Sequence, residues 1–142
     1  DEKIQFELDG VVEKEIKQAY CIENLEFCVS CMDYTTLKVS DTEESVKNFT
    51  ADLLKKLKKF NLRDVAAVCV FSNYAGIVRE GLKGTEIQTA VVAGNFPNSQ
   101  TFTEIKLAEC KMAIGAGAQE VDVVISVGDI LEKNYEKVLF WS

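Results

Sequence analysis

Four short apolar runs with the period of a β-strand alternate along the chain with segments that have the period of an α-helix. The strand-like runs span residues 27–33, 66–71, 88–94 and 120–126. Strands that alternate with helices pair in parallel through right-handed crossovers. The pattern therefore predicts an α/β fold with a parallel sheet, either an open doubly wound sheet or part of a (β/α) barrel.

The helical segments are predicted from apolar spacing and from capping residues. The helix after the first strand begins at Ser40 or Thr42, either of which can serve as its N-cap. The helix after the third strand begins with the capping box Thr101-x-x-Glu104 and has one apolar stripe that we expect to be buried. The stripe consists of Ile105, Ala108, Met112 and Ala116. The predicted helices span residues 10–20, 42–60, 74–82, 101 to either 115 or 117, and 130–138.

The charge and hydropathy of the chain argue against nucleic acid and membranes as partners. The 142 residues contain 16 Lys and Arg against 23 Asp and Glu, a formal net charge of −7. Nucleic acid and anionic membranes both require clustered basic residues, so we expect neither as a partner. The acidic start DEKIQFELDG lacks the apolar core of a signal peptide, and no run approaches the ~20 apolar residues of a membrane span. We expect one domain, residues 1–142, in the cytoplasm.

The cysteine and histidine content argues against metal chemistry. Five cysteines are an odd number, which favours free thiols in a reducing compartment. Cys28 and Cys31 form a CxxC motif, but on the predicted strand they would face opposite sides, roughly 10 Å apart. Histidine is absent, which excludes Ser-His-Asp and Cys-His catalysis within the chain. We therefore expect no metal and no cofactor.

The segment GAGAQEVDVVIS, Gly115–Ser126, places a carboxylate in a strand-like apolar run. With a period of two residues, Val121 and Val123 share an apolar face, and Asp122 points to the opposite side. A buried ionised carboxylate without partners would cost several kcal/mol. Asp122 must therefore be paired, hydrogen-bonded, hydrated or protonated, which is typical of an acid/base group and also of a structural ion pair.

Four segments, in this order, resemble a known family. They are MDYTTL (Met32–Leu37), AAVCVFSNY (Ala66–Tyr74), the run that ends in NFPN (Asn95–Asn98), and KLAEC with AIGAGAQEVDVVISVG (Lys106–Gly128). In order and spacing they are similar to deoxyribose-phosphate aldolase, a class I aldolase with a TIM-barrel fold. The resemblance implies reversible cleavage of 2-deoxy-D-ribose 5-phosphate to acetaldehyde and D-glyceraldehyde 3-phosphate through a lysine Schiff base, without a metal or cofactor.

Three residues match positions that matter in that family, and a fourth lies where the active site of a barrel is expected. By motif match, Asp122 is the catalytic aspartate that shuttles protons through a bound water, although a structural ion pair is the alternative. Asp33 matches an aspartate of the polar network near the family's lysines, and Cys69 matches a cysteine that lines its pocket. Asn95 falls at the end of the third strand, on the side of a barrel where active sites lie.

The resemblance also implies a half barrel, approximately the first four βα units with an N-terminal helix, because a full barrel takes ~250 residues. The family's Schiff-base lysine lies on its sixth strand and the partner lysine on its seventh, so we expect this chain to be inactive alone. Lys38 and Lys106 are not expected to replace them, since no apolar strand residues flank either amine to desolvate it. Without the lysines, Asp122 should be an exposed, solvated carboxylate.

Two other interpretations stay open. A half barrel would have unpaired edges on its first and fourth strands, so the chain could be a non-catalytic module that associates with itself or with a complementary barrel half. A flavodoxin-like domain could also use an acid at a strand end, but Asp33 has no acidic neighbour before Asp41. We expect a small phosphorylated sugar as substrate and, as protein partner, a second copy or a complementary barrel half.

Overall fold

The computed structural model describes residues 2–16 and 19–139, and its four strands form one parallel sheet. The strands lie in the order β1-β2-β3-β4, so neighbours in sequence are neighbours in the sheet. They are β1 (Asp33–Thr35), β2 (Ala67–Phe71), β3 (Gln88–Ala93) and β4 (Glu120–Val123). A flavodoxin-like or other doubly wound sheet reverses its strand order at a switch point. No reversal occurs among these four strands, which favours the barrel-type interpretation.

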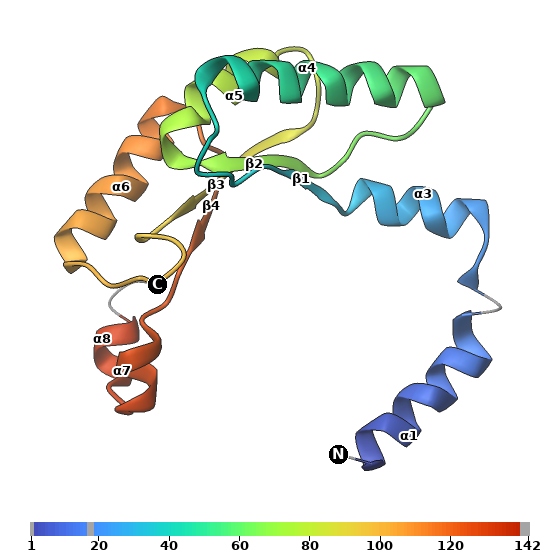
Figure 1. The fold of residues 1–142 in the computed structure, drawn as a ribbon, viewed down its shortest axis with the longest axis horizontal. Helices are drawn as coiled ribbons and strands as arrows, with labels where there is room; N and C mark the ends of the chain where they lie inside the picture. The colour runs from blue at the N-terminus through green and yellow to red at the C-terminus, as the bar shows by residue number, and fades with distance from the viewer. Residues whose placement is uncertain (1, 17–18, 140–142) are drawn as a thin grey trace.

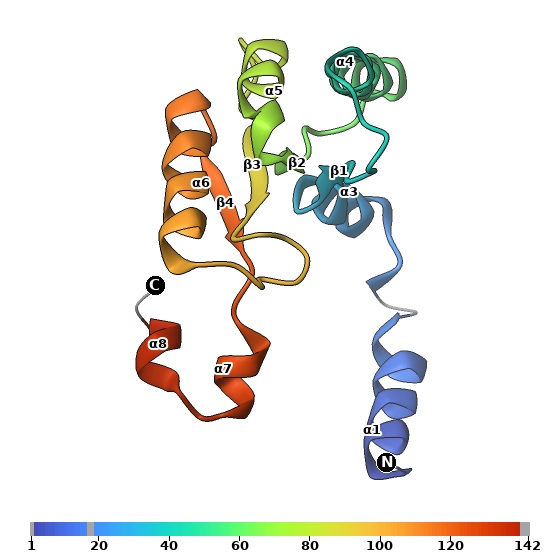
Figure 2. The same cartoon turned by 60° about the vertical axis from the view of Figure 1, so that its left-hand side comes forward.

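Three helices pack on one face of the sheet, as Figures 1 and 2 show. They are α4 (Glu43–Phe60), α5 (Ala75–Gly81) and α6 (Thr103–Ala116), and a 3₁₀ turn, η2 (Ser72–Tyr74), leads into α5. The core beneath them is made of aliphatic side chains from the strands and helices. Its largest fully buried members are Leu82, Ile87, Val46, Val68, Val70, Val78 and Val91.

The structure confirms the predicted bounds of α4, which follows the N-cap Thr42 and ends at Phe60. Thr42 is the N-cap, and its side chain accepts a hydrogen bond from the backbone N–H of Ser45 while the Ser45 hydroxyl accepts one from the N–H of Thr42. Asn61 is the C-cap, and its left-handed backbone (φ 51°) stops the turn. Val46, Leu53 and Leu57 face the core, whereas Phe60 is exposed.

The predicted strand over residues 27–33 is wrong for most of its length. Residues 22–30 form the helix α3 (Ile22–Ser30), and β1 begins only at Asp33. The run contains strand-favouring residues, but Ile22, Leu25 and Val29 also recur at the spacing of a helix. Cys28 is therefore helical, and both it and Cys31 are exposed.

The remaining helices depart from the sequence-based boundaries near the two ends of the chain. The chain starts with α1 (Glu2–Val11), which is followed by the π-helical turn η1 (Val12–Ile16). No side chain of α1 is buried. Both elements lie away from the sheet in the two views (Figures 1 and 2). Residues 17 and 18 of the predicted segment 10–20 lie outside the described residues. Near the other end, the helix predicted over 130–138 is two short helices, α7 (Val127–Leu131) and α8 (Tyr135–Leu139).

The helix α6 begins at Thr103, two residues after the predicted N-cap. Phe102 holds the cap position without a side-chain hydrogen bond, so the capping box Thr101-x-x-Glu104 is wrong. Of the two predicted ends, Gly115 and Gly117, the structure selects Gly117, which caps the helix with a φ of 111°. No described helix is both long enough and apolar enough to span a membrane.

Candidate functional site

The register of the parallel sheet brings three of the sequence-predicted site residues to one face. Thr35, Cys69 and Glu120 lie on one line across the sheet, with Ala90 between the last two. Asp33 precedes Thr35 by two residues and Asp122 follows Glu120 by two. Side chains two apart on a strand point the same way. Asp33, Cys69 and Asp122 therefore share the face opposite the covering helices.

The Cys69 thiol is the buried member of this set, with only 4% of its surface exposed. Burial, together with the negative charges of Asp122 and Asp33, raises its pKa from 9.0 to about 11. A hydrogen bond from the side chain of Thr35 acts in the opposite direction. Cys69 is thus a neutral thiol near pH 7 and a weak nucleophile.

The Asp122 side chain is exposed, as the sequence predicts for a carboxylate without the family's lysines. Among the described residues it has no hydrogen bond or ion pair, and its electrostatic effect falls on Cys69. Its neighbour Val121 packs against the core on the helix side of the sheet. The structure therefore confirms that Asp122 points away from the apolar face.

Asn95 lies where the sequence predicts, just beyond the carboxyl end of β3. Gly94 and Asn95 both have positive φ values, 77° and 61°, so the chain turns sharply as it leaves the strand. An added Cβ at Gly94 would lie 3.0 Å from a methyl carbon of Val123 and 3.3 Å from the N of Val124, so a larger side chain would be strained there. The turn therefore begins with Gly94 packed against the end of β4.

Glu109 of α6 is a functional candidate that the sequence analysis missed. One of its carboxylate oxygens accepts hydrogen bonds from the N–H groups of Gly94 and Asn95, each at 3.0 Å. The other accepts one from the Ser72 hydroxyl at 2.9 Å. A glutamate on a helix is expected to face solvent, and the only available signal was its place three residues after Lys106.

The expectation that Lys106 is not desolvated is wrong. Only 3% of its surface is exposed, and burial lowers the pKa of its amine below the ordinary 10.5. Its Nζ donates to the Ser99 hydroxyl at 2.5 Å, and that hydroxyl donates to the carbonyl of Val124 at 2.7 Å. Desolvation comes from the loop after β3 and from the end of β4, rather than from flanking strand residues.

The face of α6 that packs on the sheet is therefore not the predicted stripe. Lys106 and Ala113 are buried, whereas Ile105 and Met112 are exposed, Met112 to 74%. The exposed stripe lines a pocket of about 790 Å³ between α6 and the ends of β2 and β3. Phe71, Phe96, Ala108 and Ala116 also line this pocket.

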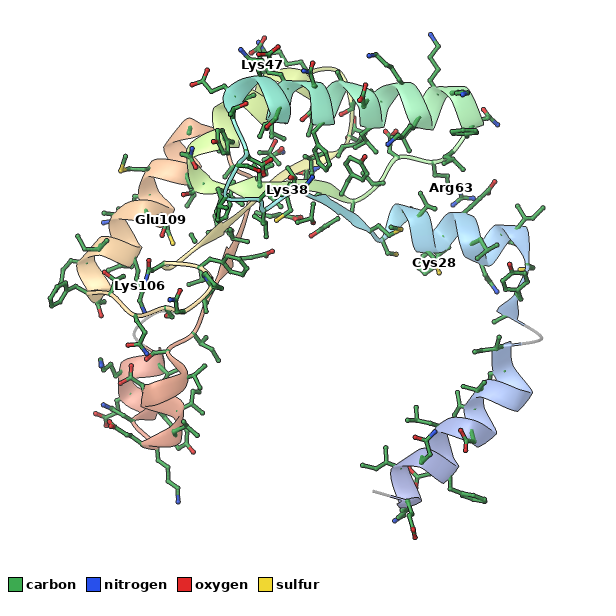
Figure 3. The ribbon with its side chains drawn as sticks, in the orientation of Figure 1. Cys28, Lys38, Lys47, Arg63, Lys106 and Glu109 are labelled. Atoms are coloured by element: carbon green, nitrogen blue, oxygen red, sulfur yellow. The ribbon has the colours of Figure 1, made fainter. Side chains whose placement is uncertain are left out.

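Among the described residues, no group of three or more His, Cys, Asp or Glu side chains is arranged to hold a metal ion. Glu109 and Lys106 are already hydrogen-bonded to the strand ends and to the loop after β3. Figure 3 shows Lys106 and Glu109 on α6, on the side that faces the loop after β3. The site therefore combines two exposed acids, Asp33 and Asp122, the neutral thiol of Cys69, and two hydrogen-bonded charged groups, Lys106 and Glu109.

Comparison with known proteins supports the resemblance seen in the sequence. A deoxyribose-phosphate aldolase from Clostridium novyi (strain NT) is 43% identical over 107 residues, which are 75% of this chain and 45% of the relative. Another from Streptococcus sanguinis (strain SK36) is 36% identical over 107 residues, with the same coverage. No family model matches the chain.

Solved structures agree with the sequence relatives. A deoxyribose-phosphate aldolase structure from Coccidioides immitis superposes with a TM-score of 0.68 at 27% identity, over 80% of this chain and 42% of that one. The chain is related to the deoxyribose-phosphate aldolases. A tetrameric deoxyribose-phosphate aldolase from Aeropyrum pernix has a TM-score of 0.63 at 21% identity, over 90% of this chain and 54% of that one, and shows the fold alone.

The chain spans about 45% of the length of the curated deoxyribose-phosphate aldolases that it matches. Its parallel strands in sequential order, covered by helices on one face, fit the barrel-type α/β architecture of these neighbours. The predicted fold class is confirmed at this level.

Proposed function

We propose that this chain supplies the first four βα units of a (β/α) barrel of the deoxyribose-phosphate aldolase type. The proposed reaction is reversible, class I cleavage of 2-deoxy-D-ribose 5-phosphate to acetaldehyde and D-glyceraldehyde 3-phosphate through a lysine Schiff base. The observation that carries the proposal is the shared face of Asp33, Cys69 and Asp122 in a chain 43% identical to a curated aldolase. The proposed substrate is therefore a small phosphorylated sugar.

In this proposal Asp122 is the catalytic proton shuttle. Its exposed carboxylate can exchange protons with a water molecule, which a buried and ion-paired acid would do poorly. Asp33 and Asn95 support the polar network around it. Cys69 lines the pocket as a neutral thiol, since its raised pKa makes a nucleophilic role unfavourable at neutral pH.

The Schiff-base lysine is proposed to come from outside this chain. None of the four described strands contains a lysine, and the resemblance assigns both of the family's lysines to later strands. Lys106 is desolvated, but its amine is hydrogen-bonded to Ser99 and nearly inaccessible. We therefore expect the 142-residue chain to form no imine by itself.

Borohydride trapping tests this proposal. The 142-residue chain, incubated with 2-deoxyribose 5-phosphate and borohydride, should show no lysine adduct in its peptide mass spectrum. A chain extended into a full barrel should show one, and Asp122→Asn in that chain should lower kcat about 100-fold or more. Glu104→Gln, an exposed acid on α6, is the matched control. An adduct on the short chain contradicts its inactivity, and none on the extended chain contradicts the aldolase proposal.

A second candidate function is favoured by the edges of the sheet. Within the described residues, β1 and β4 each pair on one side only. On the face opposite the covering helices lie Ala67, Cys69, Ala90 and Val92, which form an apolar cluster of their own. The chain could therefore be a non-catalytic half barrel that binds a second copy or a complementary half. Sedimentation of a well-folded monomer at micromolar concentration would count against this candidate.

The proposed compartment is the reducing cytoplasm. The odd number of cysteines predicts free thiols, and all five are unbonded in the structure. Labelling of the protein with a thiol reagent directly after extraction under non-reducing conditions should modify the exposed Cys28 and Cys31. Resistance of both thiols would contradict a reducing compartment.

A further inference from the structure

Two charged side chains of α6 point toward the strand ends instead of toward solvent. Lys106 and Glu109 are three residues apart, so they lie on the same side of the helix. Lys106 is buried and Glu109 is half-buried. Removing a charged group from water lowers the stability of the fold unless hydrogen bonds offset the loss of hydration. The hydrogen-bond partners of Lys106 and Glu109 therefore show what these two charged groups do.

Glu109 joins the ends of two strands through one carboxylate. The successive N–H groups of Gly94 and Asn95 converge on one oxygen, and the Ser72 hydroxyl donates to the other. Ser72 directly follows β2, and Gly94 directly follows β3. Hydrogen bonds to an ionised acceptor are stronger than neutral ones. The carboxylate therefore holds the sharp turn at Asn95 against the end of β2.

Lys106 joins the loop after β3 to the end of β4. Its ammonium group donates to the Ser99 hydroxyl, which donates in turn to the carbonyl of Val124. Val124 directly follows β4 and lies two residues after Asp122. Asp129 of α7 is also close enough for its charge to favour the protonated amine. Lys106 therefore connects the loop that contains Asn95 to the strand that carries Asp122.

We propose that Lys106 and Glu109 are positioning residues, which hold the carboxyl ends of β2, β3 and β4 in the arrangement that the proposed active site needs. The proposal rests on the proposed function, because the residues being positioned are Asn95 and Asp122. Neither charged group needs to touch the substrate in this role. The carboxylate and the ammonium act through the backbone of the segments they bind.

Amide resonances of the 142-residue chain test the Glu109 part. Glu109→Gln can place its amide oxygen where one carboxylate oxygen lies and its NH₂ toward Ser72, so it should keep the fold. The Gly94 and Asn95 amide protons should nevertheless shift, because a neutral oxygen accepts more weakly than a carboxylate. Glu109→Ala should speed hydrogen exchange at these two amides about tenfold or more. Glu104→Gln should do neither.

The Lys106 part is tested in the same way. Lys106→Met keeps an unbranched apolar stem of nearly the same length but removes the donor to Ser99. We expect the backbone resonances of Ser99 and Val124 to shift, while Lys111→Met, which changes an exposed lysine of the same helix, leaves them unchanged. Lys106→Arg keeps a charged donor, so the Ser99 and Val124 resonances should shift less in this variant than in Lys106→Met.

Three outcomes would overturn the proposal. In the first, Glu109→Gln leaves the Gly94 and Asn95 resonances unchanged. In the second, Glu109→Gln and Lys106→Met both produce shifts spread evenly over the sheet, as a general packing role predicts. In the third, Lys106→Met affects Ser99 and Val124 no more than Lys111→Met does. None of these measurements depends on aldolase activity, so failure of the trapping experiment and failure of this proposal are distinguishable.

Discussion

At the scale of single residues, two aspartates seven positions apart differ in burial and in hydrogen bonding. Asp122 is exposed on β4, whereas Asp129 is buried at the start of α7 and accepts a hydrogen bond from Lys137 Nζ at 2.8 Å. That bond and one involving Ser126 lower the pKa of Asp129. The contrast shows that Asp129 is bonded within the fold, whereas Asp122 has no hydrogen bond or ion pair among the described residues.

The exposure of Asp122 predicts that Asp122→Asn costs little stability. The change removes a charge that has no hydrogen-bond partner among the described residues, so the free energy of unfolding should stay within about 0.5 kcal/mol of the original. Urea denaturation measures it. Asp129→Asn is the comparison and should be clearly more destabilising, because it replaces the charged acceptor of the Lys137 bond with a weaker, neutral one. A large loss for Asp122→Asn would favour a structural ion pair instead.

The buried thiol of Cys69 should react far more slowly than the exposed thiols. Its pKa is about 11 against an ordinary 9.0, so near pH 8 its thiolate fraction is lower by roughly 100-fold. Burial of the sulfur adds a steric barrier. Mass-resolved labelling with a disulfide reagent should modify Cys28 and Cys31 first. Labelling of all three at equal rates in the folded protein would contradict the pKa shift and the burial.

At the scale of elements, the sequence predicts where structure occurs better than which face is buried. Capping signals narrow two helix ends to a pair of residues each, and the structure selects Thr42 over Ser40 and Gly117 over Gly115. The buried face of α6 was not predictable, because hydropathy assigns Lys106 and Glu109 to solvent. Their hydrogen bonds to strand ends overcome that preference, and such tertiary bonds have no signature in local sequence.

The N-cap of α4 gives a measurable element-level prediction. Thr42→Ala removes the acceptor of the Ser45 N–H and should lower the free energy of unfolding by about 1 kcal/mol. Ser40→Ala changes the other residue that the sequence offers as a cap, and should have little effect. Urea denaturation of both variants provides the test. No loss for Thr42→Ala would show that the reciprocal bonds between Thr42 and Ser45 do not stabilise the helix.

The burial of Lys106 on α6 predicts that the free energy of unfolding depends on pH in the alkaline range. Burial lowers the pKa of Lys106 in the folded protein, so between that value and 10.5 the unfolded chain binds more protons than the folded one. Stability from this group therefore rises with pH across that window. Lys106→Met should remove this part of the rise, whereas Lys111→Met should keep it. Unfolding curves collected across the alkaline range measure the difference, and identical pH profiles for the two variants would contradict it.

At the scale of the whole molecule, the alternation of strands and helices predicts the sheet, but not how the sheet is completed. The order β1-β2-β3-β4 follows from short right-handed crossovers between successive strands. The sequence does not predict what pairs with the free edges of β1 and β4, because local periodicity does not identify the partner strand. Exposed edge strands commonly pair with other chains unless charge or a covering element prevents it.

A charge on the β4 edge tests whether the chain associates through its sheet. Val123 is paired with Ala93 of β3, and its side chain is 38% exposed. If β4 also pairs with another copy, Val123→Lys should weaken that association, because lysine on an edge strand disfavours edge-to-edge pairing. Sedimentation at micromolar concentration should then show a shift toward monomer, with an unchanged far-ultraviolet circular dichroism spectrum.

The control is Val39→Lys, which introduces the same charge at a fully exposed position outside the sheet. It should leave the sedimentation profile unchanged if the edge is the interface. Equal shifts in both variants would assign the effect to net charge, since the chain starts at −7 and each substitution adds one positive charge. A monomer in every sample would rule out self-association through β4 in this concentration range, which leaves the remainder of a barrel as the partner for that edge.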